Sequence, residues 1–451
     1  MTVLVEGWLA RAAAARPAHA AVEAPAGIWT YGELLAHARA GASELAARGA
    51  RAGERVAIAL PGGLDFAQAL HACLLLGAVA VPLDTRLSER ERCHIADGAA
   101  LLLEEPLRRA SPAAAQAPLA AGHDLDAVAV VLHTSGTSAR PRPVELTYGN
   151  FLWSALASAV ALERDPRERW LCALPVAHVA GLSILLRSAI YATTAVVHER
   201  FETDRVLHAL AGGEITLISL VATTLARLLE ARLSKPPSLR CALTGGGPIP
   251  GPLRERARAA GVPVSLTYGL TEACSQVSTT PMELMRRAGP VPGPPLFCVR
   301  VRVDGSEAPH EEGEILISGP TVAPTALTSD GWLRTGDVGF LDPEGHLHVA
   351  GRRADTIITG GENVAPAEVE AVLESHPDVL EAAVIGRADA DWGESVTAIV
   401  VPHPGRALSG AALRDHCART LARYKVPREV VVSTDPLPRT RSGKLLRRAL
   451  S

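Results

Sequence analysis

Short apolar runs alternate with stretches of helical periodicity between residues 54 and 270. The apolar runs cover residues 54–60, 127–133, 169–175, 194–200, 215–221, 239–245 and 262–269. Helical stretches such as TTLARLLEARL at 223–233 and GPLRERARAAG at 251–261 lie between them. Continuously apolar strands separated by helices are typical of parallel sheets that are buried on both faces. We therefore predict an α/β arrangement for this part of the chain.

The pattern changes near residue 296, where the helical periods stop. Short strand-like segments up to residue 350 are separated by Gly, Asp and Pro turns, which predicts antiparallel hairpins. A compact α+β pattern follows, with helices expected at 366–376 and 412–424 and a strand at 394–402.

These changes place a domain boundary near residue 353. A chain of this length usually holds more than one domain. We predict a large N-terminal domain of parallel-rich sheets with helices at 1–353, which includes a β-rich subdomain at about 290–350. A small, mobile α+β C-terminal domain is expected at 354–451.

Composition excludes several classes of function. The 451 residues are 48% hydrophobic and 21% charged, as in an ordinary soluble globular protein. A net charge of -3 provides no general attraction to nucleic acid or to an anionic membrane. Only 4% of residues are aromatic, which argues against a base-stacking surface. The most apolar stretch, 66–82, is broken by Gln68 and His71 and is too short to span a bilayer.

Cysteine usage and the N-terminus indicate where the protein works. The seven cysteines are scattered and form no CxxC pair, so neither a zinc site nor a disulfide framework is expected. Glu6 precedes any long apolar run, which is unlike a signal peptide. We predict a cytoplasmic protein with buried thiols.

A loop rich in glycine and hydroxyl groups follows the apolar run at 127–133. Its sequence is TSGTSARPRPV at 134–144, without the spacing of a Walker loop. Backbone N–H groups and hydroxyls in such a loop can bind a phosphate, although a loop of this composition alone is more often an ordinary turn. The candidate phosphate ligands are Thr134, Ser135, Gly136, Thr137, Ser138 and Arg142.

Further motifs follow in order along the chain. They are TGGGPIP at 244–250, TYGLTEACSQ at 267–276, GWLRTGDVG at 331–339, GRRADTIITGGENVAPAEVE at 351–370 and PRTRSGKLLRR at 438–448. Each has a plain structural alternative, such as a turn, a helix cap or a solvated basic tail. Together they resemble the adenylate-forming superfamily of acyl- and aryl-CoA synthetases, peptide-synthetase adenylation domains and luciferases.

The chain departs from the superfamily pattern at a few positions. The superfamily loop usually reads TSGTTGxPKGV, whereas this chain has Ser138, Ala139, Arg142 and Pro143 at four of its positions. Ala139 and Pro143 reduce backbone freedom, while Arg142 keeps a cation. Ala354 stands at the hinge, where Asp or Lys is frequent, and alanine tolerates the rotation a hinge needs.

The resemblance implies a role for each matched residue. Gly245, Gly246, Gly247, Tyr268 and Gly269 would form the adenine site, with the tyrosine ring as a stacking face. Thr271 would contact phosphate, and Glu272 would be an oxygen ligand of Mg²⁺. Asp337 and Arg352 would bind the ribose.

The resemblance also implies a two-step reaction that uses ATP, Mg²⁺ and coenzyme A as co-substrate. A carboxylate attacks the α-phosphate of ATP to form an acyl-adenylate, and a thiol then displaces AMP. Lys444 would bridge the carboxylate and phosphate oxygens as a compact ammonium. The small domain that carries it would act as a lid and rotate between the two steps.

The segment LPVAHVAGLSILLRSAIY at 174–191 is most similar to o-succinylbenzoate–CoA ligases of menaquinone biosynthesis. Such a substrate has a second carboxylate that must be held. Helical spacing places Arg187 on the pocket side, with His178 and Ser219 as further lining residues. The alternative for Arg187 is a surface helix arginine.

Three other functions stay open. They are a CoA ligase for another aromatic or acyl acid such as benzoate, a nucleotide-binding protein without turnover, and an adenylation partner of a carrier protein. The expected partners are a small carboxylic acid, ATP and CoA, without nucleic acid or a membrane span. The oligomeric state is open, with a homodimer as one alternative.

Overall fold

The computed structural model describes residues 3–87, 89–109, 119–120, 122–134, 142–306, 308–352, 355, 357–359, 362–389, 393–421, 423–440 and 445–450. The chain packs into two compact units. The first comprises Met1–Gly246, Ala260–Arg300 and Ile317–Leu333, and the second comprises Gly247–Ala259, Val301–Leu316 and Arg334–Ser451. The domain boundary near residue 353 stays a prediction, because packing alone does not show which part of the chain rotates.

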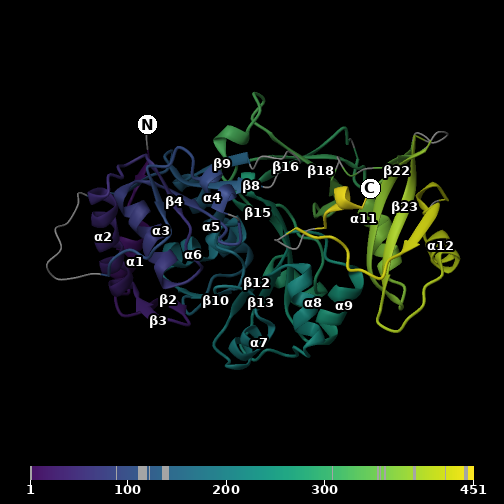
Figure 1. Ribbon diagram of the computed structural model, residues 1–451, viewed down its shortest axis with the longest axis horizontal. Helices are drawn as coiled ribbons and strands as arrows, with labels where there is room; N and C mark the ends of the chain where they lie inside the picture. Colours follow the sequence, from purple (N-terminus) through teal and green to yellow (C-terminus); the bar gives the residue numbers. More distant parts are fainter. Residues whose placement is uncertain are drawn as a thin grey trace. The chain divides into compact units, whose positions relative to one another are not determined.

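The larger sheet of the first unit has eight strands in the order β15-β14-β13-β12-β10-β11-β2-β3. Figure 1 labels several of them, among them β10, β12 and β13. The strands from β14 to β2 run parallel, and β15 and β3 pair antiparallel at the two edges. Their bounds are β2 Ala20–Ala24, β3 Gly27–Thr30, β10 Arg169–Cys172, β11 Thr194–Val197, β12 Leu217–Leu220, β13 Cys241–Thr244, β14 Val264–Leu270 and β15 Ser275–Thr279. The apolar runs from 169 onward therefore form the predicted parallel strands.

A second sheet of five strands has the order β6-β4-β5-β8-β9. Its neighbours are parallel except β8 and β9, which form an antiparallel pair. The bounds are β4 Arg55–Ile58, β5 Val79–Pro82, β6 Leu101–Leu103, β8 Val128–Thr134 and β9 Arg142–Thr147. A short antiparallel pair, β1 (Leu4–Val5) with β7 (His123–Asp124), accompanies it.

Helices of the first unit pack around these sheets and enclose a core that includes Phe66, Leu70 and Trp170. They are α1 Trp8–Ala15, α2 Tyr31–Ala47, α3 Leu64–Leu76, α4 Glu89–Ile95, α5 Tyr148–Ala161, α6 Val179–Tyr191, α7 Thr203–Ala211, α8 Ala222–Glu230 and α10 Met282–Ala288. A capping box starts α5, where the Thr147 hydroxyl accepts from the Asn150 N–H. None of the helices in the described residues has the length and apolarity needed to cross a bilayer.

The second unit contains most of a four-stranded sheet and all of a five-stranded one. The first has the order β16-β17-β18-β19, and the second runs β21-β20-β23-β22 with β24 paired to β23. The bounds are β16 Arg300–Asp304, β17 Gly313–Ser318, β18 Leu333–Leu341, β19 Leu347–Arg352, β20 Ile357–Thr359, β21 Glu362–Val364, β22 Val379–Asp389, β23 Gly393–Pro402 and β24 Glu429–Val432. The helices are α9 (Gly251–Ala259), α11 (Pro366–Glu374) and α12 (Gly410–Ala418).

Two expectations from the sequence need correction. The helix expected at 412–424 ends at Ala418, and a separate 3₁₀ turn covers Arg423–Lys425. The seven cysteines are all free, as expected, but Cys93 is exposed and Cys298 is half-buried. Cys93 lies in α4, a short helix of mostly charged residues that offers little apolar surface to cover it.

Candidate active site

The glycine and hydroxyl loop connects β8 to β9 as a hairpin. Thr134, the last residue of β8, is registered against Arg142, the first residue of β9. The Thr134 hydroxyl donates to the Arg142 carbonyl over 3.5 Å, and the arginine is exposed. The structure thus brings these two predicted phosphate ligands together at the base of the loop. Ser135, Gly136, Thr137 and Ser138 lie outside the described residues.

The three glycines after β13 differ in whether, and why, the backbone requires glycine at their positions. A Cβ on Gly245 would lie 2.4 Å from the Thr267 carbonyl oxygen, so no side chain fits there. Gly246 has a φ of +79°, in the left-handed region that favours glycine. Gly247 begins a segment of the second unit, and a Cβ there would meet open space. Close approach therefore requires glycine at position 245, next to the strand that leads to Tyr268.

The motif containing Tyr268 turns sharply at its end. A Cβ on Gly269 would lie 1.7 Å from the Ser275 carbonyl oxygen, because β14 and β15 pair tightly around a bulge. Thr271 and Glu272 then form a 3₁₀ turn, where both are half-buried. The Glu272 carbonyl accepts a 2.8 Å hydrogen bond from the Ala323 N–H. This hydrogen bond ties the turn to the segment that contains Ala323.

The residues suit a magnesium ion that arrives with a nucleotide. No group of three or more His, Cys, Asp or Glu side chains in the described part of the chain could hold a metal. Mg²⁺ commonly takes one or two carboxylates and completes its shell with phosphate oxygens and water. Glu272 fits this role as a single carboxylate, without a protein cage.

The two predicted ribose ligands are cross-strand partners in the second unit. Asp337 on β18 is registered against Arg352 on β19, and the arginine Nε lies 2.7 Å from the Asp337 Oδ1. Asp337 is buried, while the side chain of Arg352 is about half exposed. The Asp337 N–H donates to the Thr335 hydroxyl over 3.0 Å. The carboxylate is therefore fixed in orientation by its neighbours.

Arg187 is a buried cation inside the first unit. It lies on α6 and is only 3% exposed, so it is not a surface arginine. Its Nη2 donates a 2.9 Å hydrogen bond to the Ser154 hydroxyl, which donates in turn to the Cys274 carbonyl over 2.7 Å. No carboxylate of the described residues pairs with it, and its Nε has no hydrogen-bond partner there. Burial consequently lowers the pKa of Arg187.

Trp170 connects Arg187 to Ser219. The guanidinium of Arg187 lies 5.7 Å from the centre of the Trp170 ring, within cation–π range. The indole N–H of Trp170 donates a 3.0 Å hydrogen bond to the Ser219 hydroxyl. Two of the three predicted substrate residues are therefore linked through a tryptophan that the sequence argument did not select.

His178 lies at the opposite end of α6, as the residue before its first turn. Its Nε2 is 3.9 Å from Oδ2 of Asp84. Arg86 donates to the same carboxylate, from Nη2 to Oδ2 over 2.6 Å and from Nε to Oδ1 over 2.9 Å. Burial opposes ionisation of Asp84, but the Arg86 hydrogen bonds prevail and lower the pKa of this carboxyl. Asp84 lies two residues after the apolar strand β5, a placement that could have marked it in the sequence.

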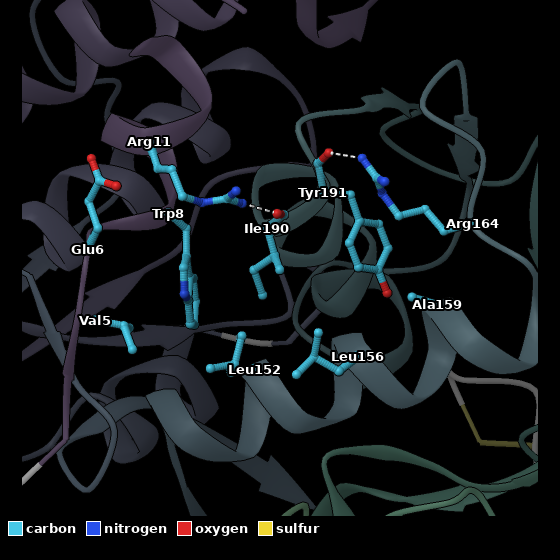
Figure 2. A pocket seen from close by; sticks show the side chains of 10 residues that line it. All are labelled: Val5, Glu6, Trp8, Arg11, Leu152, Leu156, Ala159, Arg164, Ile190 and Tyr191. Atoms are coloured by element: carbon cyan, nitrogen blue, oxygen red, sulfur yellow. Dashed lines mark hydrogen bonds between the residues drawn. The ribbon is translucent and has the colours of Figure 1, made fainter. Parts of the chain in front are cut away.

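A groove beside the C-terminal end of α6 contains none of the predicted site residues (Figure 2). Arginines in and near it bind the last carbonyls of the helix: Arg11 donates to Ile190, and Arg164 donates to Tyr191 over 2.8 Å (Figure 2). Cations at a helix C-terminus complement its dipole. These arginines therefore stabilise the helix that carries Arg187.

Comparison with known proteins identifies the class of this chain. Residues 9–103 and 96–325 match the AMP-binding enzyme family, and residues 368–444 match the AMP-binding enzyme C-terminal domain. The chain belongs to the family of AMP-binding enzymes.

Individual relatives of the chain indicate a narrower class of enzyme than the family does. A 2-succinylbenzoate–CoA ligase from Bacillus subtilis is 41% identical, over 98% of this chain and 97% of that protein. The solved o-succinylbenzoate CoA synthetase from Bacillus subtilis with the acyl-adenylate intermediate OSB-AMP is 40% identical, with a TM-score of 0.90, over 99% of this chain and 98% of that one. Its complex with ATP and a magnesium ion is 39% identical, with a TM-score of 0.89, over 99% of this chain and 100% of that one.

These similarities confirm two expectations from the sequence. The resemblance to the adenylate-forming superfamily, and within it to o-succinylbenzoate–CoA ligases, is confirmed. The predicted α/β class, with a large N-terminal and a smaller C-terminal domain, is confirmed as well.

Proposed function

We propose that this chain joins 2-succinylbenzoate to coenzyme A at the expense of ATP, as a step of menaquinone biosynthesis. Membership in the AMP-binding family and full-length similarity to 2-succinylbenzoate–CoA ligases support an AMP-forming acid–thiol ligase. The structural observation that carries the substrate choice is the buried guanidinium of Arg187, which no carboxylate of the described residues neutralises.

The reaction proceeds in two displacements. A substrate carboxylate oxygen attacks the α-phosphorus of ATP, and the bond to pyrophosphate breaks. The thiol sulfur of CoA then attacks the acyl carbonyl, its proton leaves, and the bond to AMP breaks. The first step needs no general base, because a carboxylic acid is already ionised at neutral pH. Catalysis is therefore mainly positioning and charge neutralisation.

The chain supplies the positive charge at two motifs. Arg142 and the hydroxyls from Thr134 onward bind the phosphates, and Lys444, outside the described residues, bridges the carboxylate and the α-phosphate. Thr271 contacts phosphate beside Glu272, which binds Mg²⁺. When bound, the ion draws negative charge from the phosphate oxygens.

The nucleoside is held by residues whose local geometry suits the task. The glycines from Gly245 and the Tyr268–Gly269 pair provide backbone and an aromatic face for adenine. Asp337, oriented by Arg352, accepts hydrogen bonds from the ribose hydroxyls. Residues 354–451 act as the lid that carries Lys444, and residues 1–353 form the large domain.

Arg187 binds the substrate carboxylate that is not activated. An isolated buried charge is costly, so an anionic ligand would gain from neutralising it. Benzoate has no second carboxylate and would leave the guanidinium unneutralised, which favours 2-succinylbenzoate over this runner-up. Ser219 accepts from Trp170 and still has its own proton to donate to the substrate. We also assign His178, the residue before the start of α6, to the substrate.

Two further properties complete the proposal. The enzyme works in the cytoplasm, which the seven free cysteines support because disulfides are rare there. The oligomeric state is open between a monomer and a homodimer, and light scattering on the purified protein would distinguish them.

A panel of acids tests the proposed substrate. Pyrophosphate release should be fastest with 2-succinylbenzoate and much slower with benzoate or a fatty acid. A preference for benzoate would favour the runner-up. Tight ATP binding without pyrophosphate release from any acid would instead indicate a nucleotide-binding protein.

A further inference from the structure

Glu370 joins three segments of the second unit around one buried carboxylate. It lies on α11, is 8% exposed, and accepts a 2.8 Å hydrogen bond from the Val384 N–H of β22. Arg447 donates from Nη2 to both carboxylate oxygens, over 2.7 and 2.6 Å. Both carboxylate oxygens are thus satisfied by one guanidinium nitrogen in a charge-assisted contact. Arg447 belongs to a 3₁₀ turn, Arg447–Ala449, three positions beyond Lys444.

The same arginine reaches the start of the small domain. Its Nη1 lies 3.3 Å from Oδ2 of Asp355, the residue after the Ala354 hinge position. Arg447 therefore links the C-terminal turn to α11 and to the hinge side of the domain. Burial raises the pKa of Glu370, while the charge of Arg447 opposes this and favours the ionised carboxylate.

The chain before residue 441 is held beside the chain after residue 444. Arg439 and Leu445 form an antiparallel bridge, and the Leu446 N–H donates to the Pro438 carbonyl over 2.8 Å. Arg439 also pairs with Glu381 of β22 over 3.4 Å. Leu445 packs against a cluster of apolar side chains from β22 and β23. Both flanks of residues 441–444 are thus anchored to the sheet and to α11.

We propose that Arg447 is a positioning residue for adenylation: its ion pairs with Glu370 and Asp355 fix residues 445–450, the part of the chain that directly follows Lys444. The inference rests on the proposed function, because it takes Lys444 as the adenylation lysine. Arg447 itself lies outside the reacting groups. Its loss should impair the first half-reaction and leave the second intact. The second half-reaction is spared because the lysine has by then done its work.

Half-reaction kinetics separate positioning from general damage. Arg447→Gln should lower pyrophosphate release by roughly 10²-fold, the scale of a misplaced catalytic group. Thioester formation from added acyl-adenylate should stay at the wild-type rate. Arg387→Gln, which breaks an exposed 2.8 Å pair with Glu429 in the same unit, is the matched control and should leave both half-reactions unchanged. Normal pyrophosphate release by Arg447→Gln would overturn the proposal.

Arg447→Gln alone leaves the buried carboxylate of Glu370 without its arginine, which could by itself damage the fold. A double variant separates this effect from the loss of positioning. Glu370→Gln with Arg447→Gln leaves no buried carboxylate without its arginine, because Asp355, the other partner of Arg447, is about a third exposed. Adenylation should remain low, because the ion pairs of Arg447 are still absent. Recovery of wild-type adenylation in this variant would show that Arg447 serves folding alone. Normal adenylation by Lys444→Gln would end both the proposed role of the lysine and this inference. If wild-type enzyme makes no thioester, the proposed function fails by itself.

A structural readout does not depend on turnover. The chain has three lysines, Lys235, Lys425 and Lys444, so a lysine-specific endoprotease has few sites. Arg447→Gln in the full-length protein should speed the release of residues 445–451, while cleavage after Lys425 serves as the internal control. An unchanged rate of cleavage after Lys444 would show that the ion pairs of Arg447 do not hold this part of the chain, whatever the activity of the enzyme.

Discussion

The guanidinium of Arg187 donates a 2.9 Å hydrogen bond to the hydroxyl of Ser154. The same hydroxyl donates to the carbonyl of Cys274, two residues after Glu272. One buried serine thus joins the cation proposed for the spectator carboxylate to the turn proposed for phosphate and magnesium.

Replacement of Arg187 by alanine should raise the KM for 2-succinylbenzoate on the order of 10–100-fold, because a hydrogen bond to a charged group is lost. The KM for ATP should change little. Steady-state kinetics with each substrate varied in turn make the comparison, and Arg205→Ala, which removes an exposed arginine of α7, is the control. Equal increases in both KM values would exclude this role.

Ser154→Ala should lower the free energy of unfolding by about 1–3 kcal/mol, because Arg187 Nη2 would lose its buried acceptor. Urea denaturation followed by circular dichroism measures the change. The half-buried Ser43 of α2, whose hydroxyl donates to the Arg39 carbonyl, provides a comparison without a buried charge, and alanine there should shift stability by less than about 0.5 kcal/mol. A loss no larger than that of Ser43→Ala would mean that water replaces the hydroxyl.

Gly245→Ala and Gly247→Ala form a matched pair. At Gly245 a Cβ would lie 2.4 Å from the backbone oxygen of Thr267, whereas at Gly247 it would meet nothing. We expect Gly245→Ala to cost about 1–3 kcal/mol of stability, as overpacking does, and Gly247→Ala to cost much less. Thermal unfolding of both variants tests this, and equal melting temperatures would contradict the packing argument.

Lys444→Arg should retain the charge yet lose adenylation, with a loss on the order of 10²-fold or more, because a planar guanidinium does not take the place of a compact ammonium. Pyrophosphate release measures the first step. A rate close to wild type would show that charge alone is sufficient at this position.

Glu374 should make stability depend on pH. Burial, then the neighbouring Glu370, raises the pKa of Glu374 to about 7, above its usual value of 4.5. The folded state therefore holds a proton that the unfolded state loses, and stability falls as pH rises from about 4.5 to about 7. Glu374→Gln should remove about 1–3 kcal/mol of this fall, measured by urea denaturation at pH 5 and pH 7.5. Parallel pH curves for both proteins would refute it.

The strands that the sequence predicted best are those that burial makes continuously apolar. The runs at 127–133 and 169–175 became β8 and β10 because both faces of these strands are covered. β15 was missed because its sequence, SQVST, is largely polar. Those polar side chains are buried through hydrogen bonds to one another, such as the 2.8 Å bond from Gln276 to Thr279. Hydrophobic periodicity cannot detect such a strand.

The site was predictable where a motif is local and hidden where partners are distant in sequence. Thr271 and Glu272 occupy one turn, so their sequence alone brings them together. Ser154 and Trp170 reach Arg187 only through the packing of α5 and β10 against α6. No spacing rule connects such residues, because their proximity depends on the tertiary fold.

The most direct test of the central claim is to incubate the purified protein with 2-succinylbenzoate, ATP, Mg²⁺ and CoA and to identify the products by mass spectrometry. The account predicts 2-succinylbenzoyl-CoA with equimolar AMP. Absence of this thioester, together with a thioester from benzoate or another acid under the same conditions, would contradict it.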